Sequence, residues 1–267
     1  RQRVKPPHIL LTTPESLSLL LSYPDAALMF ADLQTVIVDE VHVFATQKRG
    51  DLLSLSMARL QTINPALRRV ALSATVADID AYRAWLAPDG DIDTVAAVLG
   101  EAGAEPNVTI LIPEGRVPWS GHSGKYAANQ VMAEIAAHQT TLVFCNTRGL
   151  AELIFQELWS ANDANLPIAI HHGSLSIEAR RKVESAMADG KLRALVATAS
   201  LDLGVDWGNV DCVIQMGAPK GSSRLLQRIG RANHRLDQAS EAILIPGNRF
   251  EYLEARAALD AVEAGER

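Results

Sequence analysis

The chain has 267 residues, which is long enough for two domains of ordinary size. Its hydrophobic content of 48%, with only 5% aromatic residues, is typical of α/β cores rich in Ala, Leu and Val and excludes a disordered chain. The formal net charge of −6 excludes a global basic field. It does not exclude nucleic-acid binding, because a groove needs only local cations and backbone N–H groups.

Cys145 and Cys212 lie in apolar stretches, as reduced thiols in a cytosol would. No apolar run is long enough to cross a bilayer, and no signal peptide is visible. The chain begins with Arg1 and not with Met. We therefore expect a piece of a longer cytoplasmic protein, with no membrane partner.

An apolar strand is predicted at 8–12, and it runs into Thr13 and Pro14. Threonine as a helix cap with proline in the first turn explains both residues locally. A helix N-terminus at a strand end can also bind a phosphate, so a functional interpretation stays open. The helix should continue through 17–21, and a longer amphipathic helix is predicted over 50–63.

The most informative stretch is Val36–His42, which reads Val-Ile-Val-Asp-Glu-Val-His. Its β-branched residues predict a strand buried on both faces, as in a parallel sheet. The strand ends in Asp39 and Glu40, where open α/β sheets have their ligand crevice. One carboxylate can hold a divalent metal, and the other can deprotonate a water aimed at phosphorus. A solvated acidic turn is the structural alternative, and this stretch alone does not decide between the two.

The next strand is predicted at 69–72, and it ends in Ser73-Ala74-Thr75, which by itself is common turn chemistry. A helix is predicted at 78–86 and a strand at 92–98. Prolines and glycines then surround one more strand at 108–112, which indicates a crossing between domains. We therefore predict domains at residues 1–112 and 113–267.

The second half alternates strands and helices, which predicts a parallel, doubly wound sheet. Strands are predicted at 141–145, 167–171, 193–198, 211–216 and 242–246, and helices near 125–138, 147–159, 176–189, 222–232 and 249–264.

Several of these strands are followed by polar residues that fit phosphate chemistry. Thr147 can cap a helix and Arg148 can bind a phosphate, while the adjacent His171 and His172 make a poor zinc site without further ligands. The segment 198–206 places a hydroxyl, a glycine and a carboxylate around one turn, and 227–231 brings two arginines to a helix. Each has a local explanation, such as a solvated basic helix. All of them fall at the crevice edge of the predicted sheet.

Taken in order, these stretches closely resemble the motifs of superfamily 2 DExH-box helicases. Val-Asp-Glu-Val-His is similar to their Walker B motif, and Ser73-Ala74-Thr75 to their coupling motif. The segment 198–206 resembles their Thr…Gly-x-Asp motif, and 227–231 their arginine-finger motif.

Further stretches resemble the large helicase-related (Lhr-like) family within that superfamily. They are Thr-Thr-Pro-Glu-Ser-Leu at 12–17, the linker at 113–122, and Leu-Leu-Gln-Arg-Ile-Gly-Arg-Ala-Asn-His at 225–234. The linker and residues 248–251 look most like the bacterial branch associated with a DNA ligase and the DNA damage response.

The resemblance implies two RecA-like domains of doubly wound parallel sheet, the first of them incomplete and with apolar faces partly uncovered. It implies ATP and Mg²⁺ as cofactors, with Asp39 holding the metal, Glu40 activating water, and Gln227 and Arg231 reaching the γ-phosphate. The remaining residues that it assigns are His42, Gly204, Asp206, Arg228 and His234 to the nucleotide, Ser73 and Thr75 to coupling, and Thr13, Pro14, Arg148, Gly173 and Thr198 to nucleic acid.

The implied activity is ATP-dependent 3′-to-5′ movement along single-stranded or partly duplex DNA, with RNA left open. The implied partners are the ligase and nuclease of a repair system. The bacterial branch would place the protein in the cytoplasm, on the nucleoid when it is bound to DNA.

Two features depart from the superfamily pattern. Many members carry an arginine where this chain has His234, which makes that phosphate contact weaker or sensitive to pH. No Gly-x-x-x-x-Gly-Lys-Ser/Thr occurs, so the loop that cradles the phosphates is missing and we expect this chain alone to be inactive. The alternative is a helicase-like module that only binds nucleic acid or a partner. Intact Asp39, Glu40, Gln227 and Arg231 argue against it.

Overall fold

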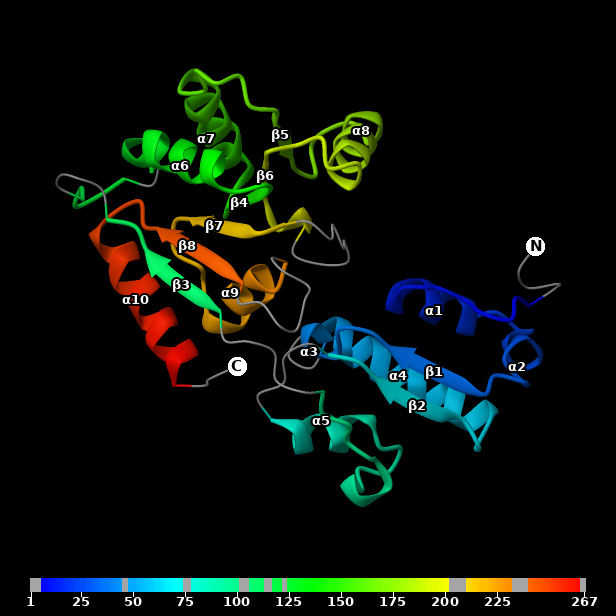
Figure 1. Cartoon of the computed structure of the whole chain (residues 1–267). Helices are drawn as coiled ribbons and strands as arrows, with labels where there is room; N and C mark the ends of the chain where they lie inside the picture. Colours follow the sequence, from blue (N-terminus) through cyan, green and yellow to red (C-terminus); the bar gives the residue numbers. More distant parts are fainter. Residues whose placement is uncertain are drawn as a thin grey trace. The chain divides into compact units, whose positions relative to one another are not determined.

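The computed structural model describes residues 6–44, 48–73, 78–100, 106–112, 117–121, 124–201, 210–231 and 240–264. Its contacts divide the chain into two compact units, Arg1–Gly100 and Glu101–Arg267. Each unit is built on a parallel sheet with helices, so the predicted α/β class is confirmed (Figure 1). Cys145 and Cys212 are free and buried, and burial raises the pKa of both thiols to about 12.

The first unit contains a parallel pair of strands, β1 (Thr35–Val38) and β2 (Arg68–Ala71). Helix α4 (Lys48–Ile63) lies between them in sequence, as in a βαβ unit, and α1 (Pro14–Leu21) packs along it (Figure 1). The remaining elements of this unit are α2 (Ala26–Met29), α3 (Val41–Phe44), α5 (Ile79–Leu86) and the 3-10 turn η1 (Ile92–Thr94).

Only one face of this small sheet is well covered. Val38 is buried, together with apolar residues of α1, α3 and α4. Ile37 points away from them and is 62% exposed, so the prediction of a strand buried on both faces was wrong. A strand becomes buried on both sides only when helices cover both faces of its sheet. Exposed Ile37 agrees with the expectation that the apolar faces of this unit are partly uncovered.

The second unit holds a six-stranded parallel sheet with the order β3-β8-β7-β4-β6-β5. Every strand predicted after residue 140 is present, to within one residue at either end. The strands are β3 (Asn107–Ile110), β4 (Thr141–Cys145), β5 (Ile168–His171), β6 (Ala194–Ala197), β7 (Cys212–Met216) and β8 (Glu241–Ile245).

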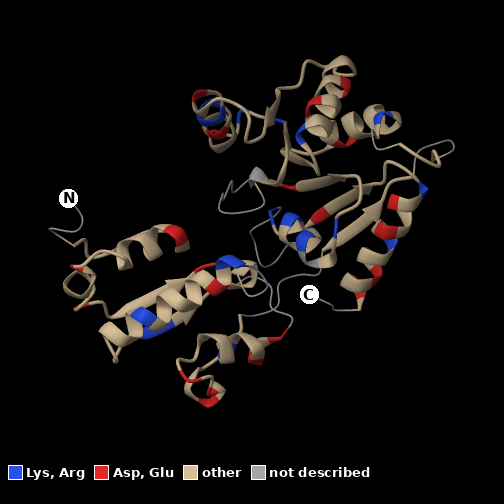
Figure 2. Cartoon of the chain, turned by 180° about the vertical axis from the view of Figure 1, so that it is seen from behind, with Lys and Arg blue, Asp and Glu red and all other residues tan. Residues whose placement is uncertain are grey.

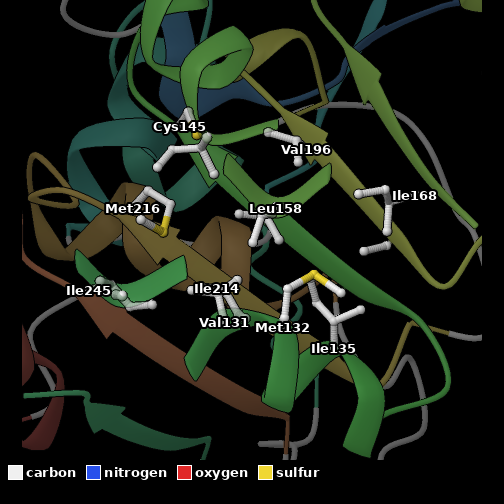
Figure 3. Close-up of a cluster of buried hydrophobic side chains, with 14 of the residues drawn as sticks. Val131, Met132, Ile135, Cys145, Leu158, Ile168, Val196, Ile214, Met216 and Ile245 are labelled. Atoms are coloured by element: carbon white, nitrogen blue, oxygen red, sulfur yellow. The ribbon is translucent and has the colours of Figure 1, made fainter. Parts of the chain in front are cut away.

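Helices cover both faces of this sheet because successive strand residues point to opposite sides. Val143 and Cys145 of β4 pack with α6 (Ala128–Ala137) and α7 (Arg148–Ser160), in the cluster drawn in Figure 3. Leu142 and Phe144 face the other side, where α8 (Ile177–Ala188) contributes Met187. On that side α9 (Ser222–Ile229) and α10 (Arg249–Glu263) cover β8 (Figure 1). Short 3-10 turns, η2 (Lys125–Ala127) and η3 (Ala199–Leu201), complete the unit.

The division between the units lies earlier in the chain than the predicted boundary after Ile112. Strand β3 pairs with β8, with Asn107 beside Glu241, and therefore belongs to the second sheet. The compact units accordingly divide between Gly100 and Glu101. The segment read as a crossing thus supplies an edge strand to the second unit.

Two predicted strands are absent from the described residues. Residues 8–12 form no strand, and 92–98 form the turn η1 followed by irregular backbone. Arg83 explains the second difference, because its guanidinium donates to the Ile92 and Val95 carbonyl oxygens at 2.9 and 2.8 Å. A side chain thus satisfies acceptors that a neighbouring strand would otherwise have to satisfy.

The revised boundary predicts a difference between two fragments. A fragment of residues 101–267 should be at least ~2 kcal/mol more stable than one of residues 113–267, because β3 contributes Val108, Ile110 and ladder hydrogen bonds. The shorter fragment should also aggregate more readily, because it exposes the edge of β8. Urea unfolding measures the stability difference. Equal midpoints for the two fragments would contradict the assignment of β3 to the second unit.

Candidate functional site

The acidic end of β1 is a tight turn. Glu40 has a φ of 51°, in the left-handed region that residues other than glycine rarely adopt. Such a conformation costs on the order of 1–3 kcal/mol and is concentrated at functional sites. The Glu40 N–H donates to Asp39 Oδ1 at 2.9 Å, and the Val41 N–H donates to the Leu72 carbonyl at 3.0 Å. The turn therefore leaves Asp39 exposed at the strand end and brings Glu40 back toward β2.

His42 connects the acidic turn to the end of β2. Its Nδ1 lies 2.7 Å from Ser73 Oγ and 3.5 Å from Glu40 Oε2. The imidazole is 10% exposed, whereas the Glu40 side chain is 30% exposed. His42 is thus the packed member of a short chain of polar groups that runs from Glu40 to Ser73. These three predicted residues come together in the structure, while Thr75 lies outside the described residues.

Thr13 and Pro14 have the predicted local roles. Thr13 caps α1, because its Oγ1 accepts a hydrogen bond from the Ser16 N–H at 3.3 Å, and Pro14 is buried in the first turn. Next to them, Arg49 Nε donates to Glu15 Oε1 at 2.6 Å. This hydrogen bond lowers the pKa of Glu15 to about 2 and joins α1 to α4. Thr13 itself stays exposed at the helix start.

Three predicted nucleic-acid residues reach one edge of the second sheet, where β4, β5 and β6 lie side by side. Arg148 Nη1 donates to Ser174 Oγ at 2.8 Å, which ties the start of α7 to the loop after β5. Gly173 is the exposed neighbour of Ser174. The Thr198 N–H donates to the His171 carbonyl at 3.3 Å. The edge therefore presents a guanidinium, an open glycine and a threonine.

Arg148 is accompanied by a carboxylate, Glu152, that the sequence motifs did not indicate. Glu152 Oε1 lies 3.8 Å from Arg148 Nε and 3.4 Å from His172 Nε2. The neighbouring His171 has its own carboxylate, with Nε2 3.0 Å from Glu184 Oε1. The adjacent histidines are thus paired with acids. The spacing of Arg148 and Glu152, four residues apart on a predicted helix, was the signal that could have found this pair.

Arg228 differs from the role that the resemblance implied, because its side chain is inside the second unit. It is 1% exposed, and its Nη1 donates to Gln215 Oε1. The same nitrogen lies 3.4 Å from Asn146 Oδ1, and the guanidinium stands 4.9 Å from the centre of the Phe144 ring. Arg228 therefore joins α9 to β4 and β7, and its guanidinium is engaged inside the second unit.

Gln227 and Arg231 are half-buried beside this network, the first on α9 and the second just after the helix ends at Ile229. Both belong to the second unit, whereas Asp39 and Glu40 belong to the first. Gly204, Asp206 and His234 lie outside the described residues.

The distribution of charged residues over the two units agrees with the small net charge of the chain. Lysine and arginine are interspersed with aspartate and glutamate on both units (Figure 2). Among the described residues, no group of three or more His, Cys, Asp or Glu side chains is arranged to hold a metal ion. None of the described helices combines the length and the apolar character that a membrane span requires.

Comparison with known proteins adds two family matches. Residues 1–82 match the DEAD/DEAH box helicase family, and residues 125–235 match the helicase conserved C-terminal domain. The chain is 38% identical to the ATP-dependent helicase Lhr-Core of Methanocaldococcus jannaschii over 95% of its length, and covers 30% of that protein. It is 34% identical to the Lhr helicase/uracil glycosylase of Escherichia coli over 97% of its length, and covers 20% of that protein.

A solved structure gives the same result. Mycobacterium smegmatis helicase Lhr bound to ssDNA and AMP-PNP superimposes with a TM-score of 0.85 and 34% identity, over 99% of this chain and 35% of that one. Two parallel-sheet units with these matches define a DEAD/DEAH box helicase core. Within that class, the chain belongs to the Lhr-like family, as its relatives at 34 and 38% identity indicate. Its place in the ligase-associated branch stays a prediction.

The buried position of Arg228 predicts a structural effect of its loss. Arg228→Ala should lower the free energy of unfolding by about 2–4 kcal/mol, because Gln215 loses a donor and a cavity opens beside Phe144. Arg181→Ala, at an exposed position on α8 of the same unit, should change it by about 0.5 kcal/mol or less. Denaturant unfolding followed by circular dichroism measures both. If Arg228→Ala left stability normal but abolished nucleotide binding in a protein that joins this chain to a Gly-Lys-Ser/Thr phosphate loop, Arg228 would be a nucleotide residue.

Proposed function

We propose that this chain forms the motor core of an ATP-dependent helicase or translocase that moves 3′ to 5′ along single-stranded or partly duplex DNA and serves DNA repair. The observation that carries the proposal is the His42 bridge between Glu40 and Ser73. It connects the carboxylate that would activate water to the end of β2, whose Ser-Ala-Thr segment would respond to the bound strand. A solvated acidic turn would have no need of such a bridge.

The acidic turn fits a nucleotide that brings its own metal. Magnesium in such sites is bound by one or two carboxylates together with substrate phosphates, so the single exposed Asp39 is sufficient. Mg²⁺-ATP would supply the γ-phosphoryl group, and ADP would be the leaving group when water attacks the γ-phosphorus. Glu40 would orient the attacking water and accept its proton. Its left-handed backbone conformation sets the direction in which the side chain leaves the turn.

The second unit would complete the hydrolytic site. Gln227 and Arg231 would reach the γ-phosphate, and Arg231 would stabilise charge on the transferring group, an effect worth ~10³–10⁵ in rate in related phosphoryl-transfer enzymes. Gly204, Asp206 and His234 would lie near the ribose and phosphates. Arg228 would support this set from inside the unit, because it holds α9 to the sheet.

The strand would run along residues that bind phosphates without reading bases. Arg148 is 61% exposed, and its guanidinium donates to the Ser174 hydroxyl with the Glu152 carboxylate 3.8 Å from Nε. The guanidinium can exchange the neutral hydroxyl for a phosphate. Gly173 and Thr198 on the same edge would add further contacts to phosphates, and so would Thr13, which stays exposed before the buried Pro14 in the first unit. Such contacts tolerate any sequence, as a translocase requires. The ligase and nuclease of a repair system are the proposed partners, and RNA is the alternative strand.

The proposal predicts which variants lose ATP turnover. The 267-residue chain should show no steady-state ATPase above its own Glu40→Gln control. In a protein that joins this chain to a Gly-Lys-Ser/Thr phosphate loop, Arg231→Ala should lower the DNA-stimulated kcat at least ~10²-fold, a barrier increase of roughly 2.7 kcal/mol. DNA affinity without nucleotide should stay unchanged.

Arg231→Lys is the matched control, because it keeps the charge and loses the planar fork. Near-normal turnover of the lysine variant would mean that Arg231 supplies only a diffuse positive field. DNA binding without any DNA-stimulated ATPase in the joined protein would instead favour the binding-module alternative.

A further inference from the structure

A cavity of about 870 Å³ opens at the carboxyl ends of β4, β7 and β8, entirely within the second unit. Its floor is formed by the residues that follow these strands, among them Thr147, Gly217 and Asn248. One side is Leu150 and Leu153 of α7. The volume lies within the range of pockets that take a small organic group. Among the described residues assigned to ATP, none lines it.

Two exposed aromatic side chains line this cavity. Trp119 and Phe250 are each 64% exposed, although large aromatic side chains are usually well covered. The Arg249 guanidinium stands 4.2 Å from the centre of the Trp119 ring, so that ring is backed by a cation.

The segment that carries Trp119 is fixed to the start of α10. The Arg249 N–H donates to the Pro118 carbonyl at 3.1 Å, and Arg249 Nε donates to the Val117 carbonyl at 3.2 Å. Asn248 Nδ2 donates to the Gly121 carbonyl at 2.7 Å. The backbone on both sides of Trp119 is therefore held in place before any ligand arrives, which lowers the entropic cost of stacking on its ring.

The charges around the cavity favour a neutral aromatic ligand over a phosphate. Glu251 and Glu254 contribute carboxylates, which repel phosphate and accept hydrogen bonds from amino groups. The cationic side chain of Lys220 also lines the cavity. A nucleobase meets these conditions, because it has a flat aromatic face and, in adenine, guanine and cytosine, an exocyclic amino group.

We propose that this cavity binds one unstacked base of the single strand, stacked on Trp119 and Phe250. The site continues the proposed strand track, because Thr147 in its floor precedes Arg148, the phosphate contact, in the chain. The phosphate would stay outside, at Arg148 or Lys220, while the base turns inward. The inference rests on the proposed function and adds a base-binding site to it.

The test measures binding of the chain to two 12-nucleotide probes of equal charge, an ordinary single strand and one made wholly of abasic sugar-phosphate. Trp119→Ala should weaken binding of the ordinary strand about 10-fold, since stacking of one base is worth roughly that much, and leave the abasic strand unchanged. Trp119→Phe should restore most of the affinity. Phe250→Ala is a second variant, expected to show the same selective loss.

Trp159→Ala is the matched control, because Trp159 is 61% exposed on the far part of α7, beside Phe155. It should bind both strands like the unmodified chain.

Equal affinity of the Trp119→Ala variant and the unmodified chain for the ordinary strand would overturn the base site while leaving the proposed function intact. Equal losses on both strands would overturn it too. Failure of the unmodified chain to bind any strand would overturn the proposed function as well. Adenosine monophosphate that binds through Trp119, with strand binding unaffected, would identify a free nucleotide as the ligand instead.

Discussion

The parallel pairing of β4 with both β6 and β7 is the constraint on which the second unit depends. In a parallel sheet all strands end at the same edge, so residues distant in sequence become neighbours. Phe144 stands beside Ala197 on one side and Gln215 on the other. The residues that follow these strands therefore meet at one edge. Parallel pairs also need long crossovers, which explains why a helix separates almost every pair of strands in the second half.

The position of a polar residue relative to the sheet also determines whether its side chain faces solvent or is enclosed. Gln215 is fully buried in β7, and its carbonyl oxygen needs a donor. Arg228 supplies that donor from α9 and spreads its guanidinium over Phe144. Arg148, at the start of α7, lies beyond the last residue of β4 and remains in solvent. Two arginines of similar appearance in the sequence thus have different roles, one in packing and one at the surface.

In the first unit, too, parallel strands bring distant residues together at one edge, although only two strands are described. Register between β1 and β2 places Val38 beside Ala71, so the acidic turn and Ser73 emerge together. His42 can then span them within hydrogen-bond distance. A one-residue slip would send Ser73 to the opposite face and break this bridge. Next to the left-handed Glu40, the Val41 N–H donates to the Leu72 carbonyl just after β2, which ties the turn to that strand end.

Periodicity predicted most of the second unit because its strands are short, apolar and separated by amphipathic helices. It failed where the outcome depended on distant groups. Ile37 is exposed because nothing among the described residues covers that face of β1. Residues 92–98 form no strand, and Arg83 donates to two of their carbonyl oxygens, those of Ile92 and Val95.

For the candidate sites, the motifs predicted the strand ends correctly, whereas the side-chain partners of the site residues are visible only in the structure. Glu152 beside Arg148 and the enclosure of Arg228 both depend on side-chain direction, which a single sequence does not specify. The sequence around Trp119 did not indicate a binding site, because the cavity that Trp119 lines is assembled from segments that are far apart in the chain.

The proposed strand track depends on binding of a nucleic-acid backbone by Arg148 at the carboxyl edge of the second sheet. The salt dependence of single-strand affinity tests it most directly, measured for the 267-residue chain between about 50 and 200 mM salt. Arg148→Ala should weaken binding and reduce the slope of log K against log salt by about 0.7, the value of one phosphate contact. Arg256 of α10 is also paired with a carboxylate, so Arg256→Ala is the control and should leave the slope unchanged. Equal slopes for the unmodified chain and Arg148→Ala would contradict the claim.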